Sequence, residues 1–259
     1  MNQIVRPSLA ARLRALTPAR VGLCRTGVSL ETRDLLDFQQ AHAQARDAVH
    51  ARLDAGGLAA ILAGITGNDV FRLHSAAADR ATYLQRPDLG RRLDEASGGR
   101  LSSLAGLFAA DRLGPSLPEL VLIVADGLSA LAVERHAPPL LKELLPRLEG
   151  WRIAPVMVVE QGRVAIGDEI GAALSAHIAV VLIGERPGLS APDSLGAYIT
   201  WEPRPGRTDA ERNCTSNIRA EGLSYSEAAA QLGYFLTEAR RRKLTGVALK
   251  EESRLLREG

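Results

Sequence analysis

The spacing of apolar residues differs between the first part of the chain and the rest. Up to about residue 118, apolar residues recur every three or four positions and clusters of β-branched residues are almost absent. This spacing predicts helices, the clearest being a long amphipathic helix over residues 30–54. The apolar face of that helix carries Leu35, Leu36, Phe38, Ala41, Ala45, Ala48, Val49 and Leu53. Shorter helices are expected over residues 8–16 and, on the two sides of Pro87, within residues 73–97.

From residue 119 onward, continuous apolar segments alternate with helical patterns. The strand-like segments are ELVLIVADG (119–127), APVMVVEQG (154–162), HIAVVLIGERPG (177–188) and the weaker GAYITWEP (196–203). Helices are expected between and after these segments, over residues 129–145, 163–176 and 224–246. The last helix starts with a Ser224–Glu227 capping box, and Gly246 suits the position just past its end.

Strands that are apolar throughout and alternate with helices indicate a parallel sheet that is buried on both faces. The expected fold class is therefore α/β, with a Rossmann-like parallel sheet, helices on both faces and a helical N-terminal region in front. We expect residues 1–118 to form the helical region and residues 119–259 to form the Rossmann-like domain.

Composition narrows the class of protein without identifying it. The 259 residues are 46% hydrophobic and 24% charged, as in ordinary globular proteins, and a net charge of +2 does not by itself imply a nucleic-acid partner. No apolar run approaches the roughly 20 residues that cross a bilayer, so no membrane segment is expected. Cys24 and Cys214 form no Cys-x-x-Cys pair, and no secretory segment begins the chain, so we expect a reducing cytoplasm.

Two turns follow strand-like segments at places where parallel sheets bind ligands. Ligands bind beyond the carboxyl ends of such strands, because loops and helix N-termini there offer free N–H groups. The first turn contains Asp126, Gly127 and Ser129, and the second spans residues 184–188 and contains Glu185. If the two strands are neighbours in the sheet, both turns lie at one edge.

Each candidate also has a purely structural interpretation. Asp126 fits the cap of the helix that follows it, Glu185 fits a solvated turn, and Cys214 fits a small buried apolar residue. The residue pattern alone favours these structural interpretations over a ligand site, because a motif is only a hypothesis until its structural context is known.

Common catalytic and metal-binding patterns are not found in the sequence. There is no Gly-x-Gly-x-x-Gly fingerprint for a dinucleotide and no Gly-x-Ser-x-Gly elbow, and Asp168 stands where a P-loop requires lysine. The histidines show no metal-ligand spacing; they are His42, His50, His74, His136 and His177. The residue pattern therefore predicts no metal ligand and matches no standard catalytic motif.

Several segments taken together resemble one known family. In chain order they are RVGLCRTG, TRDLLDFQQAHAQARDAVH, YLQRPDLGRRL, VADGLSALAVERHAPPLL, GDEIG, LIGERPGLSAPDSLGAYITWEP and RNCTSNIRAEGLSYSEAA. This series is similar to the small (light) subunit of ethanolamine ammonia-lyase, and it covers roughly residues 5–247. GERPGL followed by NCTSNI is the most specific part of the likeness.

The resemblance implies a lyase that uses adenosylcobalamin to convert ethanolamine to acetaldehyde and ammonia. In that family a large TIM-barrel subunit holds the substrate, and the small subunit closes over the cofactor between the two chains. The resemblance carries cobalamin contacts to Val164, Glu185 and Cys214. A carboxylate such as Glu185 accepts from the amide groups on the rim of the cofactor. Backbone N–H groups of residues 126–129 are then expected to donate to the amide carbonyls of the cofactor.

The same resemblance bears on partners and location. The helical region 1–118 is expected to dock the large subunit. The expected partners are therefore the large subunit and adenosylcobalamin. We expect neither a nucleic acid nor a membrane as a partner. No Asp-x-His-x-x-Gly motif is present, so a protein histidine on cobalt is not expected. Family members with a longer leader enter a bacterial microcompartment. Only a few residues precede SLAARLRAL here, so we expect the cytoplasm, with the microcompartment as the alternative.

Two other classes of protein compete with the lyase subunit. One is a non-catalytic α/β assembly protein whose helical region docks a partner. The other is a nucleotide-binding Rossmann-type domain, which would require the glycine fingerprint that the sequence lacks.

Overall fold

The structure is a computed structural model that describes residues 9–17, 19–23, 25–109 and 117–251 of the 259-residue chain. The first part contains α1 (Leu9–Arg14), β1 (Arg25–Thr26), β2 (Ser29–Leu30), α2 (Thr32–His50), α3 (Ala55–Thr66), β3 (Phe71–His74), α4 (Arg80–Gln85), the 3₁₀ helix η1 (Leu89–Arg91) and α5 (Glu95–Ala109). The second part contains β4 (Leu120–Ala125), α6 (Ala130–Leu144), η2 (Leu145–Leu148), β5 (Met157–Glu160), α7 (Ile166–Ala173), β6 (Ile178–Gly184), β7 (Leu195–Trp201), η3 (Asp209–Glu211), β8 (Arg212–Ile218), α8 (Tyr225–Arg242) and η4 (Gly246–Ala248).

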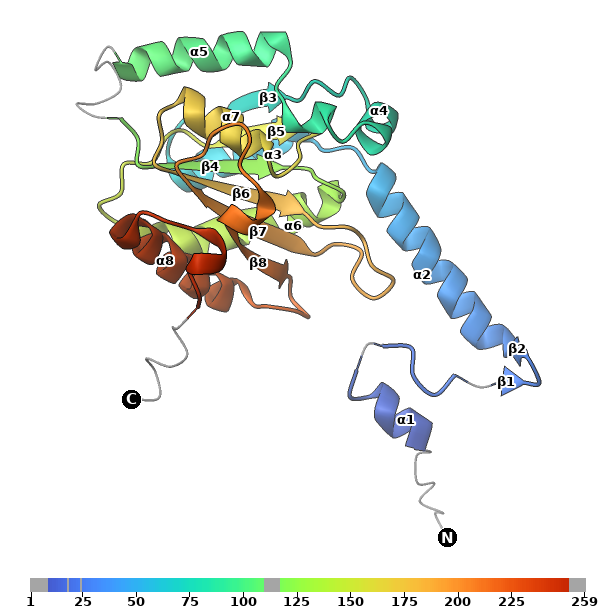
Figure 1. The fold of residues 1–259 in the computed structure, drawn as a ribbon. Helices are drawn as coiled ribbons and strands as arrows, with labels where there is room; N and C mark the ends of the chain where they lie inside the picture. The colour runs from blue at the N-terminus through green and yellow to red at the C-terminus, as the bar shows by residue number, and fades with distance from the viewer. Residues whose placement is uncertain (1–8, 18, 24, 110–116, 252–259) are drawn as a thin grey trace, which may run out of the picture.

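Six strands form one sheet in the order β3-β5-β4-β6-β7-β8. The first four are parallel to one another, whereas β7 is antiparallel to both β6 and β8. Figure 1 shows α5 and α7 on one side of this sheet and α6 and α8 on the other. The predicted α/β class, with a mostly parallel sheet, helices on both faces and a helical N-terminal region, is confirmed.

The sheet separates two hydrophobic clusters. On one face, alternate residues of β4 and β6 such as Leu122 and Val180 pack against α3, α6 and α8. On the other face, their neighbours, such as Ile123 and Val181, pack against α5 and α7. Strands buried on both faces explain the continuous apolar segments in the sequence, because successive side chains point to opposite faces.

Three features of the sheet differ from the sequence prediction. The segment predicted as a fourth parallel strand is β7, which runs antiparallel to β6. A parallel pair requires a crossover of a dozen or more residues, and the connection over residues 185–194 is too short to provide one. The pattern also missed β3, which has four residues, and β8, whose sequence RNCTSNI contains no apolar run.

Helix ends follow local signals in most places. The Ser224–Glu227 capping box starts α8 as predicted, but α8 ends at Arg242 with Lys243 in a left-handed conformation, and Gly246 lies beyond it at the start of η4. The C-terminal boundary predicted for the helix over residues 30–54 is wrong, because α2 ends at His50. Asp54 then caps α3, because its side chain accepts a hydrogen bond from the Gly57 N–H.

Helix α2 extends away from the sheet, as Figure 1 shows. Ala48 is its only buried residue, while Leu35, Leu36 and Phe38 are 42%, 57% and 40% exposed. No helix in the described part of the chain is by itself long and apolar enough to cross a membrane; α2 and α3 meet that test only when combined, and they are bent by 80°. The helix therefore presents part of its apolar face to solvent.

Candidate functional site

The two predicted turns lie at the same edge of the sheet, because β4 and β6 are paired neighbours. Gly127 has a φ of +57°, and a Cβ atom placed on it would lie 2.3 Å from the carbonyl oxygen of Gly184. The N–H of Leu128 donates to that same oxygen at 2.9 Å. Only glycine fits at position 127, and this close approach joins the turn after β4 to the turn after β6.

Asp126 and Ser129 lie below the surface of this edge. The side chain of Asp126 is 2% exposed; its Oδ1 accepts from the Gly162 N–H at 3.1 Å, and its Oδ2 lies 3.5 Å from Nη1 of Arg80. Burial raises the pKa of Asp126 to about 6, although Arg80 opposes the shift. The cap of α6 is Ser129 rather than Asp126, since Ser129 Oγ accepts from the Ala132 N–H at 3.3 Å.

Glu185 lies at the carboxyl end of β6, and its side chain extends over β7 toward β8. The backbone N–H of Glu185 donates to Ser194 O at 3.0 Å, and Oε2 accepts from the Asn217 N–H at 3.1 Å. A Cβ atom on Gly196 would lie 3.0 Å from Oε1, so the missing side chain at Gly196 leaves room for the carboxylate. The half-buried Glu185 is thus fixed across three strands.

Cys214 lies on the same face of the sheet as the side chain of Glu185, although the two residues are far apart in the sequence. Cys214 is paired in register with Tyr198 of β7, and it is exposed rather than buried, so its interpretation as a buried apolar residue is wrong. Desolvation around the sulfur raises the pKa of the Cys214 thiol; a hydrogen bond with Tyr198 opposes this shift, and the negative charge of Glu185 adds to it. Glu185, Tyr198 and Cys214 therefore form one group on the face of β6, β7 and β8.

This face is open because the helices that cover β7 and β8 lie on the opposite side. Residues of α6 and α8 pack with Ala197, Ile199 and Ile218 in the first hydrophobic cluster. On the other face, Cys214 and Ser216 are exposed and Tyr198 is half-buried. The open face thus offers a broad surface with the ring of Tyr198 at its centre.

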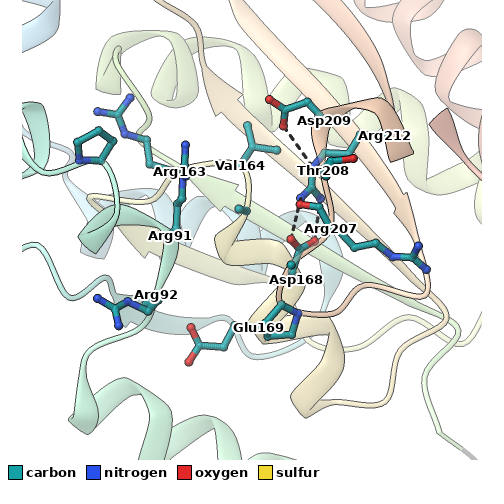
Figure 2. A pocket seen from close by; sticks show the side chains of 14 residues that line it. Arg91, Arg92, Arg163, Val164, Asp168, Glu169, Arg207, Thr208, Asp209 and Arg212 are labelled. Atoms are coloured by element: carbon teal, nitrogen blue, oxygen red, sulfur yellow. Dashed lines mark hydrogen bonds and ion pairs between the residues drawn. The ribbon is translucent and has the colours of Figure 1, made fainter. Parts of the chain in front are cut away.

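A hollow of about 830 Å³ reaches the start of β8, and Figure 2 shows the side chains that line it. Val164, just before α7, lies in its wall and is half-buried. Arg212, also in the wall, begins β8; Cys214 is two residues further along and therefore on the same face of the sheet. The hollow thus extends from Val164 to the start of β8, the strand that carries Cys214.

A buried ion pair fixes the floor of the hollow. Nη1 and Nη2 of Arg212 donate to the two carboxylate oxygens of Asp168, each at 2.7 Å, and Nη1 also donates to Thr200 Oγ1 at 2.7 Å. Both charged side chains are 2% exposed. This ion pair joins α7 to β8. The sequence analysis did not predict it, because the residues around Asp168 only exclude a P-loop and do not indicate a partner 44 positions away.

Sequence reasoning also missed Tyr198 and the arginines of the hollow. The partly polar alternation of GAYITWEP was an available signal for Tyr198, whereas nothing local links Arg91 to Arg163. Within the ranges that the structure describes, no group of three or more His, Cys, Asp or Glu side chains is arranged to hold a metal ion.

The chain is thus an α/β protein whose mostly parallel sheet has an open polar face, with an adjoining hollow lined by the turn before α7, by α7 and by the start of β8. The chain belongs to the ethanolamine ammonia-lyase light chain (EutC) family, whose model matches residues 8–250. A protein of Pseudomonas aeruginosa named ethanolamine ammonia-lyase small subunit is 59% identical to it over 245 residues, covering 93% of this chain and 86% of the relative. Proteins with the same name from Xanthomonas campestris pv. campestris and Pseudomonas syringae pv. tomato are 57% and 56% identical, each covering 94% of this chain and 88% and 83% of the relative.

Proposed function

We propose that this chain is the small subunit of an adenosylcobalamin-dependent ethanolamine ammonia-lyase, which converts ethanolamine to acetaldehyde and ammonia. In this proposal the chain closes over the cofactor at the interface with a large catalytic subunit. Family membership supports the reaction class. The observation that carries the proposal for this chain is that Glu185, held over Gly196 of β7, and Cys214, paired with Tyr198 of the same strand, share an open sheet face beside the hollow that Val164 lines.

The chemistry of these residues fits cobalamin. The cofactor presents a broad, flat corrin with amide groups on its rim. Glu185 is half-buried and is held over Gly196, so its carboxylate is placed to accept from rim amide N–H groups. Val164, Tyr198 and Cys214 provide a surface of mixed polarity for the face of the ring. A flat, half-exposed sheet surface suits such a ligand better than a closed cavity does.

When bound, adenosylcobalamin supplies the radical chemistry of the reaction. The residues of this chain hold and orient the cofactor and exclude water from it, and we assign none of them a proton transfer. The N–H groups of Leu128 and Ser129 already donate to Gly184 O and Asp126 O. We therefore propose that Asp126, Gly127 and Ser129 act at the cofactor site mainly by bracing the turn that carries Glu185.

The helical N-terminal region fits the role of docking the large subunit. Leu35, Leu36 and Phe38 expose apolar surface on a helix that has only one buried residue. Exposed apolar patches of this kind mark protein interfaces. A cytoplasmic location belongs to the same proposal, and the free thiol of Cys214 is compatible with a reducing compartment.

The test is a reconstitution of this chain with its large subunit, in which cofactor binding and ethanolamine turnover are both measured. Glu185→Ala is expected to weaken adenosylcobalamin binding by about 1–3 kcal/mol, because donors on the cofactor rim lose their acceptor. Glu149→Ala is the matched control, since Glu149 is exposed next to η2, away from the open face.

Three outcomes would count against parts or all of this function. Equal affinity for adenosylcobalamin in the wild-type and Glu185→Ala complexes would remove the role of Glu185. Full ethanolamine turnover by the large subunit alone would instead indicate a non-catalytic assembly protein. A nucleotide-binding domain would be indicated if the isolated chain bound a nucleotide and the complex did not bind adenosylcobalamin.

A further inference from the structure

We infer that Arg91, Arg92 and Arg163 form an anion site that binds the phosphodiester in the nucleotide tail of the cofactor. This inference rests on the proposed function and goes beyond it, because it assigns a charged subsite to residues for which the family likeness gave no role. The three arginines line the hollow beside Val164, as Figure 2 shows.

The hollow carries an excess of positive charge that its own carboxylates do not neutralise. Five arginines and three carboxylates line it: Arg91, Arg92, Arg163, Arg207, Arg212, Asp168, Glu169 and Asp209. Arg212 is bound to Asp168, with Asp209 3.6 Å from its Nε, and Arg207 is paired with Glu202 and Glu211. In the part of the chain that the structure describes, Arg91, Arg92 and Arg163 form no ion pair with a carboxylate within 4.0 Å, and Asp88 acts on Arg92 only over a longer distance.

Arg163 is held in place with a donor left over. Its guanidinium lies 4.1 Å from the centre of the Tyr83 ring, and Nη2 donates to Tyr83 O at 3.0 Å. The Nε atom is buried and has no hydrogen-bond partner among the described residues. A buried donor without an acceptor costs free energy that a ligand oxygen would recover. Arg163 is thus pre-organised for an anion.

The backbone brings Arg91 and Arg92 to the same place. The N–H of Arg163 donates to Gly90 O at 2.8 Å, so the end of η1 is joined to the turn before α7. A Cβ atom on Gly90 would lie 2.8 Å from Cγ of Arg163, so the glycine permits this close approach. Arg91 and Arg92 are exposed and extend from η1 into the lining of the hollow.

The phosphodiester matches this arrangement in charge and in position. It is a monoanion with exposed oxygens, which arginine binds through parallel N–H donors better than lysine does. The volume of about 830 Å³ lies within the range of small-molecule sites and leaves room for the sugar and base beside the phosphate. Val164, proposed to contact the cofactor, directly follows Arg163 in the chain. In this inference the corrin lies over the open face and its tail reaches into the hollow.

The experiment compares two ligands in the complex of this chain with its large subunit. Adenosylcobalamin contains the phosphodiester, whereas adenosylcobinamide has the same corrin and adenosyl group but no nucleotide tail. Dissociation constants are measured by spectroscopic titration. The Arg91→Gln/Arg92→Gln double variant is expected to bind adenosylcobalamin about tenfold more weakly and adenosylcobinamide unchanged, as expected when charge-assisted bonds are lost. Added salt should weaken adenosylcobalamin binding more in the wild type than in the variant.

Two further variants separate this role from a general effect. Arg163→Lys keeps the charge but removes the Nε donor, and it is expected to give a smaller loss confined to adenosylcobalamin. Arg147→Gln removes an exposed arginine of η2, next to α8 on the opposite face of the sheet, and should change neither constant. The thermal unfolding midpoint of each variant checks that the fold is retained.

The outcomes distinguish this inference from the proposed function. Equal weakening of both ligands, or no weakening, would overturn the phosphodiester site while the proposed function stands. The double variant could instead associate more weakly with the large subunit while its cofactor affinity stays unchanged. That result would overturn the phosphodiester site and indicate that the arginines bind an acidic segment of the large subunit. A wild-type complex that binds neither ligand would overturn both proposals.

Discussion

The two halves of the sheet differ in what covers them. Every residue of β4 and β6 is buried, and both strands consist almost wholly of apolar residues. In β8 buried and exposed residues are mixed, and six of the seven residues in RNCTSNI are polar or cysteine. The covered half provides most of the apolar core, whereas the open half provides the side chains proposed to meet the cofactor.

The direction of the strands explains this difference. Parallel neighbours are joined by crossovers, and the helices in those crossovers cover the faces of the sheet. The short connection from β6 to β7 brings no helix, and α8, which follows β8, packs on the opposite face. The change from parallel to antiparallel pairing therefore creates the open face, which shows how a change in topology can produce a binding surface.

The largest expected effect concerns the ion pair that connects the two halves. Asp168→Ala leaves the guanidinium of Arg212 buried without its carboxylate, which is expected to cost about 3–5 kcal/mol of unfolding free energy. Urea denaturation of the full chain measures this loss. As a control, Glu238→Ala removes ion pairs with Arg241 and Arg242 on α8, and its effect should be much smaller. Equal effects would show that the buried pair does not join the halves.

A second comparison tests the halves directly. Leu122→Ala in β4 removes a fully buried side chain and is expected to destabilise the protein by about 2–5 kcal/mol. Ser216→Ala on the exposed face of β8 is expected to change stability by no more than about 0.5 kcal/mol. Both values come from the same denaturation experiment. A large loss for Ser216→Ala would mean that the open face is part of the folded core.

The smallest expected effect is the pH dependence caused by Asp126, at the edge of the covered half. Its pKa is raised from 3.8 to about 6 in the folded chain, so the folded state binds a proton that the unfolded state has released. The contribution of Asp126 to stability is therefore fully present below about pH 4 and falls by about 2–3 kcal/mol as the pH rises through about 6. Asp126→Asn should remove this contribution. The free energy of unfolding, measured at several pH values for both proteins, will show the difference. If stability depends on pH in the same way in both proteins, the prediction is wrong.

Much of the fold was predictable where local signals and burial agree. The apolar segments of β4, β5 and β6, the Ser224 capping box and the helix after Ser129 all follow from residues close together in the sequence. The strand β8 was not predictable in this way, because its hydrogen bonds come from pairing with β7 and its exposed face carries polar residues. A strand that is apolar on one face only gives a weak signal in a single sequence.

The candidate site was predictable only in part. The candidate role of Glu185 was predictable from the rule that ligands bind beyond the carboxyl ends of parallel strands. Gly127 was predictable from its place in the turn after the neighbouring strand. Cys214 and Val164 entered through resemblance to a family, since no pattern near them indicates a ligand. Tyr198 and Arg163 had no role until the structure placed them beside those residues.

By itself the sequence determined the helices, the buried strands and the polar turns, because these depend on hydrogen bonds and side-chain periodicity within short segments. Only the tertiary structure decided the order and direction of the strands, the open face beside the hollow, and the placement of Glu185 and Cys214 on that one face. Those features depend on contacts between distant segments, in which loop length and the packing of whole helices determine which surfaces are covered and which remain exposed.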